Sequence, residues 1–321
     1  TFSADGQEQL IAAESAFTLN AVDLRSPQTP HPTLTPGERG ETMIAAVLNA
    51  EPRTPFDLER GPLWRGTLFR ISEHEHLLAL SFHHLIVDGW SIGTLIEELS
   101  EIYSAGHGAK LKTALSMREF DAQRKVDPTQ EDWWVAQLTP PPVPLELPID
   151  APRPAFKTFA ASVERRALKA DVVARLKAFS GKRRATLFTT LLATYQTLLH
   201  RLTGQDDVVV GIPAAGQSQA ADRSLIGHCV SMLPIRSRLD DNASFDQFLE
   251  QTRTFMLDAF EHQEVTFSSL LPRLKLQRDL SRTPLIETAF NFERAESGSF
   301  QGLDAEIQPL PKQFFNFDLF L

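Results

Sequence analysis

The stretch of residues 138–156, LTPPPVPLELPIDAPRPAF, constrains the fold of this chain more than any other segment. Proline fixes φ near about −65° and removes a backbone donor, so a stretch this rich in proline forms neither a helix nor a central strand. We therefore predict an extended linker here. The chain has 321 residues, which is enough for two domains. We place their boundary near residue 150, giving domains 1–150 and 151–321.

Both halves alternate strands with helices. In the first half, apolar residues and turn residues predict strands at 62–71 and 76–83, and helical spacing after residue 91 predicts a helix of about 12 residues. The same patterns in the second half predict helices at 186–202 and 244–263 and strands at 207–213 and 285–293. This alternation indicates an α/β (α+β) fold with two similar lobes. Because the chain lacks an initiator Met and its end, FFNFDLFL, resembles an interrupted strand, we expect a segment of a longer protein.

Composition excludes several classes of protein. Hydrophobic residues make up 42% of the chain, but no apolar run approaches the roughly 18–20 residues of a membrane-spanning helix, and no secretory signal is visible. The single cysteine, Cys229, excludes an internal disulfide framework and a multi-cysteine metal site. We therefore expect a cytoplasmic protein that is not integral to a membrane.

The charge is acidic and unevenly distributed. The net charge is −9, which argues against nucleic acid as a partner, because phosphate binding requires basic surfaces. Residues 1–150 carry 11 Lys and Arg against 22 Asp and Glu, whereas residues 151–321 carry 21 against 19. The densest basic cluster is GKRR at 181–184, which either receives an acidic partner or forms a solvated helix end; the second interpretation is the more common one.

The segment SFHHLIVDGWS, residues 81–91, contains the strongest candidate for a reactive group. His83 and His84 end an apolar run, and Asp88 and Gly89 follow after three apolar residues. A neutral imidazole takes up and returns a proton near pH 7, because its ordinary pKa is ~6.5. Adjacent strand residues face opposite sides, so the two rings should not chelate one metal ion. We expect one ring to face a cleft and the other to face the interior.

Other interpretations of this segment remain open. The two histidines could be ordinary core residues, with Asp88 or Ser91 capping the following helix, and spacing alone gives this interpretation equal weight. Gly89 indicates either a positive φ or a close approach of another group to the backbone. A nucleophilic pair of Cys229 with its neighbour His228 is weaker, because sequence neighbours rarely form a working pair and no Gly-x-Ser-x-Gly elbow is present.

The ordered motifs of the chain resemble those of condensation domains of nonribosomal peptide synthetases, in the chloramphenicol-acetyltransferase-like superfamily. HHLIVDG resembles the family signature HHxxxDG, and RDLSRTPLIETAFNFE (278–293) is similar to the family motif Arg-Asp-x-Ser-Arg-x-Pro-Leu. Four further segments resemble family motifs in the expected order: SMREFDAQR (116–124) before EDWWVAQL, LPIDAPRP (147–154), IGHCVSMLPIRSRL (226–239) and HQEVTFSSL (262–270). The resemblance covers the whole chain, and it implies a family unit that is truncated at both ends.

The resemblance implies a fold and a reaction. It implies two acetyltransferase-like lobes arranged as a V-shaped pseudo-dimer with a central tunnel. Donor and acceptor peptidyl carrier protein domains, with an adjacent adenylation domain, would present thioesters on phosphopantetheine arms, and the acceptor amine would attack the donor thioester to form a peptide bond. The domain itself would bind no cofactor and no metal.

The resemblance also implies roles for residues of the HHxxxDG segment. His84 matches the histidine beside the attacking amine, acting as base or as a group that positions the amine. His83 matches a supporting histidine, Asp88 the aspartate of a structural ion pair, and Gly89 a residue that leaves room or presents its amide. Trp90, Ser91 and Ser231 are the expected substrate-binding residues.

The chain departs from the family pattern at some positions. Gln217 stands where many relatives have arginine, so the partner of Asp88 would be another arginine, with Arg223, Arg236 and Arg238 as candidates. Ser231 stands where the family usually has asparagine.

Related activities remain as alternatives. Heterocyclisation relatives have aspartates in place of the histidines, and epimerisation relatives usually place Trp after Ser, whereas here Trp90 precedes Ser91. Ester formation and a catalytically silent recruiting module on the same fold stay open, although silent modules tend to lose the histidine that His84 matches.

Overall fold

The computed structural model describes residues 1–6, 8–11, 18–25, 36–123, 127–219, 224–293, 298–310 and 312–321. Its contacts divide the chain into two compact units. Unit 1 comprises residues 1–111, 226–228 and 297–313, and unit 2 comprises residues 112–225, 229–296 and 314–321. Residues 112–150 thus pack with unit 2, and the division into lobes at residue 150 stays a prediction. In the described residues, no helix combines the length and the apolar character needed to cross a membrane.

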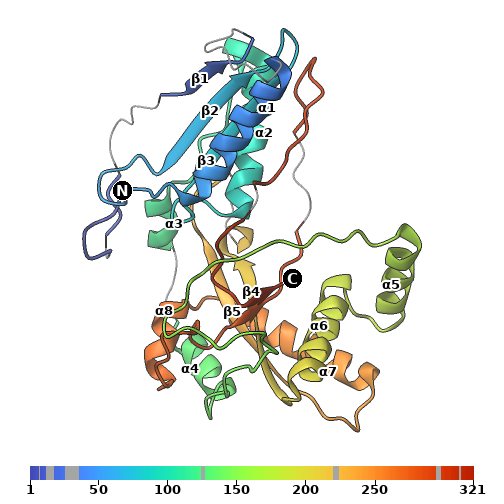
Figure 1. Cartoon of the computed structure of the whole chain (residues 1–321). Helices are drawn as coiled ribbons and strands as arrows, with labels where there is room; N and C mark the ends of the chain where they lie inside the picture. Colours follow the sequence, from blue (N-terminus) through green and yellow to red (C-terminus); the bar gives the residue numbers. More distant parts are fainter. Residues whose placement is uncertain are drawn as a thin grey trace. The chain divides into compact units, whose positions relative to one another are not determined.

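Unit 1 is built on a three-stranded sheet in the order β1-β2-β3, with α1 and α2 running alongside it (Figure 1). β1 is parallel to β2, and β2 is antiparallel to β3, with Trp64 opposite Phe82. The bounds are β1 Asn20–Asp23, α1 Pro36–Ala50, β2 Trp64–Arg70, β3 His76–Phe82 and α2 Gly89–Ala105, with short 3-10 turns at Glu51–Arg53 and Gly106–Gly108. The two strands predicted at 62–71 and 76–83 are present, but β3 ends at Phe82, one residue before the predicted end. The helix predicted after residue 91 is longer than expected.

Unit 2 has a four-stranded sheet in the order β5-β4-β6-β7. β4 (Asp207–Ala215) pairs antiparallel with β5 (Val230–Arg238) over nine residues and parallel with β6 (Thr288–Ala289), which pairs parallel with β7 (Leu319–Phe320). The helices are α3 Met117–Gln123, α4 Pro128–Gln137, α5 Ala170–Lys182, α6 Leu187–Thr203, α7 Phe245–Glu261 and α8 Phe267–Leu270, with 3-10 turns at Gly216–Gln219 and Leu271–Arg273. The predicted helices at 186–202 and 244–263 and the strand at 207–213 are confirmed.

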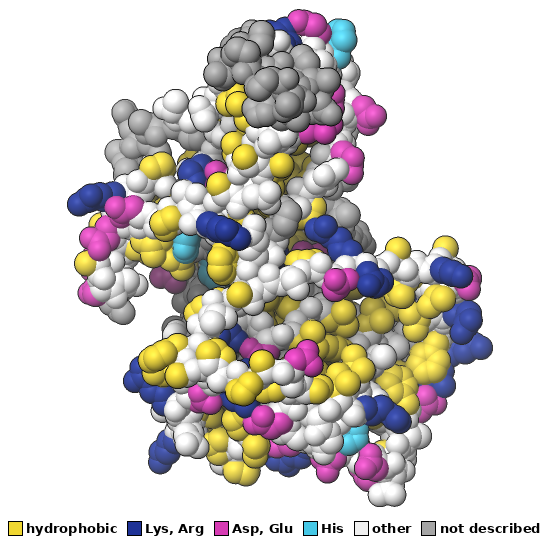
Figure 2. Space-filling view, in the orientation of Figure 1, with side chains coloured by type: hydrophobic (Ala, Val, Ile, Leu, Met, Phe, Trp, Pro, Cys, Tyr) yellow, Lys and Arg dark blue, Asp and Glu magenta, His cyan; other side chains and the backbone are white. Residues whose placement is uncertain are grey.

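The core of unit 2 lies between its helices and the strands β4 and β5. α6 contributes Leu192, Tyr195 and Leu199 to this core, and all three side chains are essentially buried. They pack with side chains from other elements, which include Trp134, Val208, Val210, Ile212, Leu233, Ile235 and Met256. Other apolar side chains reach the surface of unit 2 on the face that carries α5, α6 and α7 (Figure 2), and Leu198 and Leu257 are among those exposed.

Two expectations for unit 2 hold, and one is only partly correct. The proline-rich stretch is extended: between Leu138 and Lys169 the chain forms no helix or strand apart from an isolated bridge at Ala160. The GKRR segment ends α5, where Arg183 binds Asp246 at 2.7 Å and covers the ring of Phe179, so it is a helix end. The strand predicted at 285–293 is regular only at Thr288–Ala289. At the start of the predicted range, Leu285 has a positive φ of 63°, which interrupts an extended backbone.

Candidate active site

The two histidines lie in a loop, residues 83–88, which we call the histidine loop. β3 ends at Phe82, and residues 84–86 form a turn that the amide of Ile86 closes by donating to the carbonyl of His83 at 3.0 Å. The prediction that strand alternation separates the two rings was therefore wrong, because neither histidine is a strand residue. The rings nevertheless have different surroundings.

His84 has a defined tautomer in its neutral form. Its Nδ1 lies 2.7 Å from the carbonyl oxygen of Val87. A carbonyl oxygen only accepts, so Nδ1 carries the hydrogen and Nε2 keeps the lone pair. The side chain is exposed within unit 1. His84 therefore presents an accessible nitrogen that can accept a proton or a hydrogen bond.

His83 has the opposite arrangement. Its Nδ1 accepts from the amide of Leu85 at 3.2 Å, so Nε2 carries the hydrogen in the neutral ring. The ring packs edge-on against Phe56, at 5.8 Å between centroids, and the guanidinium of Arg65 covers Phe56 at 3.8 Å. Burial and the neighbouring His84 lower the pKa of His83 below its ordinary value. These contacts indicate that His83 has a structural role and packs the histidine loop against Phe56.

Asp88, Ser91 and Gly227 form a buried hydrogen-bonded cluster, which we call the Ser91 clamp. Asp88 Oδ1 accepts from the amide of Ser91 at 2.9 Å, which confirms Asp88 as the N-cap of α2. The Ser91 hydroxyl lies 2.8 Å from both Asp88 Oδ1 and the carbonyl oxygen of Gly227, and it accepts from the amide of Gly227 at 3.0 Å. Asp88 is 2% exposed and Ser91 is fully buried, so the clamp fixes the histidine loop from inside unit 1.

The clamp brings a third imidazole to the site. His228 follows Gly227, and its ring lies against that of His84 with 4.9 Å between centroids and an interplanar angle of 88°. Desolvation by its surroundings and the proximity of His84 lower the pKa of the otherwise exposed His228, and the carboxylate of Asp88 acts in the opposite direction. From the sequence, His228 was a candidate only as a partner of Cys229, and the one available signal was its position inside the motif IGHCVSMLPIRSRL.

The other predicted site residues lie in different places. Gly89 and Trp90 begin α2, Gly89 exposed and Trp90 half-buried. Ser231 lies on β5 of unit 2, opposite Ala214, and its predicted substrate contact stays a prediction.

The three arginines predicted as possible partners of Asp88 lie in different environments. Arg236 makes its hydrogen bonds within unit 2: its Nε donates to Asp207 at 2.8 Å, and its Nη1 donates to the carbonyl of Pro140. Arg238 is exposed at the end of β5, and Arg223 lies outside the described residues. An arginine partner for Asp88 stays a prediction.

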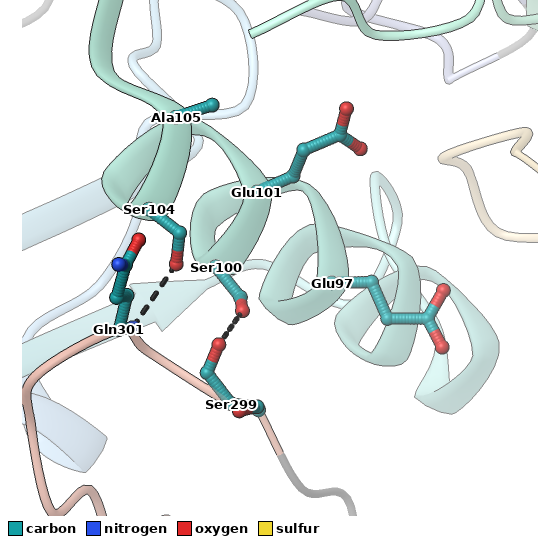
Figure 3. Close-up of a pocket in the computed structure, with 8 residues that line it drawn as sticks. Glu97, Ser100, Glu101, Ser104, Ala105, Ser299 and Gln301 are labelled. Carbon is teal, nitrogen blue, oxygen red and sulfur yellow. Dashed lines mark hydrogen bonds between the residues drawn. The ribbon is translucent and has the colours of Figure 1, made fainter.

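The far end of α2 is also held by a distant segment. The Ser100 hydroxyl donates to the carbonyl of Ser299, and the amide of Gln301 donates to the Ser104 hydroxyl at 3.0 Å. These contacts line a shallow surface pocket in which Glu97 and Glu101 project away from the hydrogen-bonded serines (Figure 3). α2 is thus fixed at both ends, by Gly227 and by residues 299–301.

The chain matches the Condensation domain family over residues 4–321. It is 32% identical to malpibaldin synthetase of Mortierella alpina over 331 residues, covering 99% of this chain and 6% of that protein. It is also 35% identical to tyrocidine synthase 3 of Brevibacillus parabrevis over 280 residues, covering 85% of this chain and 4% of that protein. The chain therefore spans only a small part of these synthetases.

Solved structures show the same fold. The X-domain from teicoplanin biosynthesis superposes with a TM-score of 0.83 at 22% identity, covering 100% of this chain and 72% of that chain. The first condensation domain of the calcium-dependent antibiotic synthetase superposes with a TM-score of 0.69 at 21% identity, covering 98% of this chain and 67% of that chain. The predicted mixed α/β, acetyltransferase-like fold class is confirmed. The chain belongs to the condensation domain family of nonribosomal peptide synthetases.

Proposed function

We propose that this chain forms peptide bonds between two thioesters carried on phosphopantetheine arms. The donor is an acyl or peptidyl thioester on one carrier protein domain, and the acceptor is an aminoacyl thioester on another. The amine nitrogen of the acceptor attacks the donor carbonyl carbon, the C–N bond forms, the C–S bond breaks, and the donor arm leaves as a thiol. An adjacent adenylation domain and a cytoplasmic location are part of the same proposal.

The observation that supports this proposal most strongly is the state of His84. Its Nδ1 is bonded to the Val87 carbonyl, which leaves an accessible lone pair on Nε2. In the proposed reaction, Nε2 accepts a hydrogen bond or a proton from the attacking amine. Positioned proton transfer contributes about 10²–10⁴ in rate, and alignment of two tethered substrates contributes further.

The surrounding residues have supporting roles in this proposal. His83 backs the loop against Phe56, and Asp88 fixes it through the Ser91 clamp. Gly89 leaves room at the start of α2 or offers its amide. The full burial of the Ser91 hydroxyl favours a structural role over the predicted substrate contact, whereas Trp90 and Ser231 remain proposed substrate contacts.

The test is a single-turnover assay with the full chain and two charged carrier domains. The donor carrier holds an aminoacyl group, and the acceptor carrier is charged from a mixture of proteinogenic amino acids. We expect His84→Ala to lower the rate of amide formation about 10²–10⁴-fold without loss of carrier binding. His83→Ala is the matched control and should mainly lower stability. Undiminished amide formation by His84→Ala would contradict the proposed role.

A recruiting function is the second candidate, because an X-domain of this fold has been solved in complex with the protein OxyB and superposes on this chain with a TM-score of 0.80 at 25% identity. The same assay separates the two functions. A recruiting module would bind a partner protein but form no amide in the wild-type chain. An ester product from a hydroxyl acceptor would instead indicate the ester-forming alternative.

A further inference from the structure

His228 is part of unit 1 although the chain on both sides of residues 226–228 belongs to unit 2. The Ser91 clamp explains how this short segment is held. Ser91 Oγ contacts both the amide and the carbonyl of Gly227, at 3.0 and 2.8 Å. Because the clamp is buried and contacts both backbone polar groups of Gly227, it holds the backbone that leads into His228, whose own side chain is exposed.

The ring of His228 meets that of His84 in an edge-to-face arrangement, with 4.9 Å between centroids and an angle of 88°. This is the arrangement that aromatic pairs prefer. The Val87 carbonyl restrains His84 at Nδ1, and His228 restrains the same ring from its side. A hydrogen bond at one atom still permits the ring to rock, and a second contact perpendicular to the ring reduces that motion.

The charge state of His228 is compatible with a packing role. Desolvation first, and then the nearby His84, lower the pKa of His228, while Asp88 raises it. The net effect favours the neutral ring at neutral pH, so His228 does not repel a proton that His84 takes up. The described residues bring no group of three His, Cys, Asp or Glu ligands together.

We propose that His228 is a positioning residue for His84: its ring packs edge-on against His84 and keeps Nε2 in the orientation that receives the acceptor amine. The proposal rests on the proposed function for its effect on rate. The ring contact itself is independent of the reaction, which allows the two to be tested separately.

The experiment compares His228→Ala with His228→Phe in the full chain, using His74→Ala as the control. His74 is an exposed histidine in the turn between β2 and β3. The readouts are the ¹⁵N resonances of the His84 ring and the kcat and KM of amide formation in the charged-carrier assay. We expect His228→Ala to lower kcat about 10–100-fold with little change in KM, because misplacement by about 1 Å is sufficient for such a loss. His228→Phe should restore most of kcat, and His74→Ala should change nothing.

The outcomes separate the possibilities. Altered His84 resonances in His228→Ala that return in His228→Phe would support the packing role even if the wild-type chain formed no amide, in which case only the proposed function fails. Unchanged resonances and rate in His228→Ala would overturn the proposal. A Phe variant that folds normally but is as slow as the Ala variant would also overturn it, because a nitrogen of His228 would then be required.

Discussion

The two units of the molecule are stabilised in different ways. Among the described residues of unit 1, the buried apolar side chains are Leu63, Phe69 and Val87, and they are matched in number by the buried polar side chains Asp88, Ser91 and Thr94. Unit 2 instead holds a large apolar core around β4 and α6. In unit 1 the candidate reactive ring is therefore positioned by hydrogen bonds and ring contacts, and in unit 2 the strands are positioned by apolar packing.

The largest effect that this comparison predicts is in unit 2. Leu192 of α6 is fully buried in the core, so Leu192→Ala removes apolar contacts and leaves a cavity. We expect a loss of about 2–5 kcal/mol in the free energy of unfolding, measured by urea denaturation. Leu198→Ala on the same helix is the matched control, because Leu198 is 46% exposed. Equal losses in the two variants would mean that the core of unit 2 is not packed as described.

The second-largest expected loss of stability comes from the Ser91 clamp of unit 1. Ser91→Ala removes the hydroxyl that accepts from the buried amide of Gly227 and lies 2.8 Å from its carbonyl oxygen. We expect a loss of about 1–3 kcal/mol, because the substitution removes buried hydrogen bonds of the Ser91 hydroxyl to Gly227 and Asp88. Ser104→Ala, at the other end of α2, should cost less, because water reaches its partner Gln301, which is exposed.

Amide formation should also slow in Ser91→Ala, since the clamp holds both the histidine loop and His228. A variant with the stability of the wild-type chain would show that hydrogen bonds do not position this loop, and the contrast between the two units would fail.

The smallest effect concerns His200 of unit 2, whose largely buried side chain contacts the exposed carboxylate of Asp241. His200, at the end of α6, contacts Asp241 through Nε2 at 2.9 Å and the carbonyl of Gln205 through Nδ1 at 3.0 Å. The bond to Asp241, followed by the bond to Gln205, raises the pKa of His200 above its ordinary value of 6.5. The stabilisation is therefore fully present below pH 6.5 and is lost as the pH rises through the raised pKa.

We expect Asp241→Ala to lower the free energy of unfolding by about 0.2–1 kcal/mol at low pH and by less at high pH. Asp121→Ala, which removes an exposed carboxylate from α3, is the control. A loss that grows with pH would contradict the sign of the shift.

The sequence was sufficient to predict the elements whose signals are local. The N-cap Asp88 and the apolar spacing of α2 predicted that helix, and proline predicted the extended stretch after α4. β6 was predicted too long, because an apolar run does not reveal a positive φ at Leu285. His228 was not identified as part of the site, because its contact with His84 joins residues 144 positions apart through the Ser91 clamp. The local sequence pattern around His84 or His228 does not predict a contact between them.

The most direct test of the central claim is the tautomer of His84, measured from its ¹⁵N chemical shifts in the wild-type chain. We expect the neutral ring to carry its hydrogen on Nδ1, bonded to the Val87 carbonyl, and to leave Nε2 without one. A ring with the hydrogen on Nε2 and none on Nδ1 would contradict it, because no lone pair would then be available to an attacking amine.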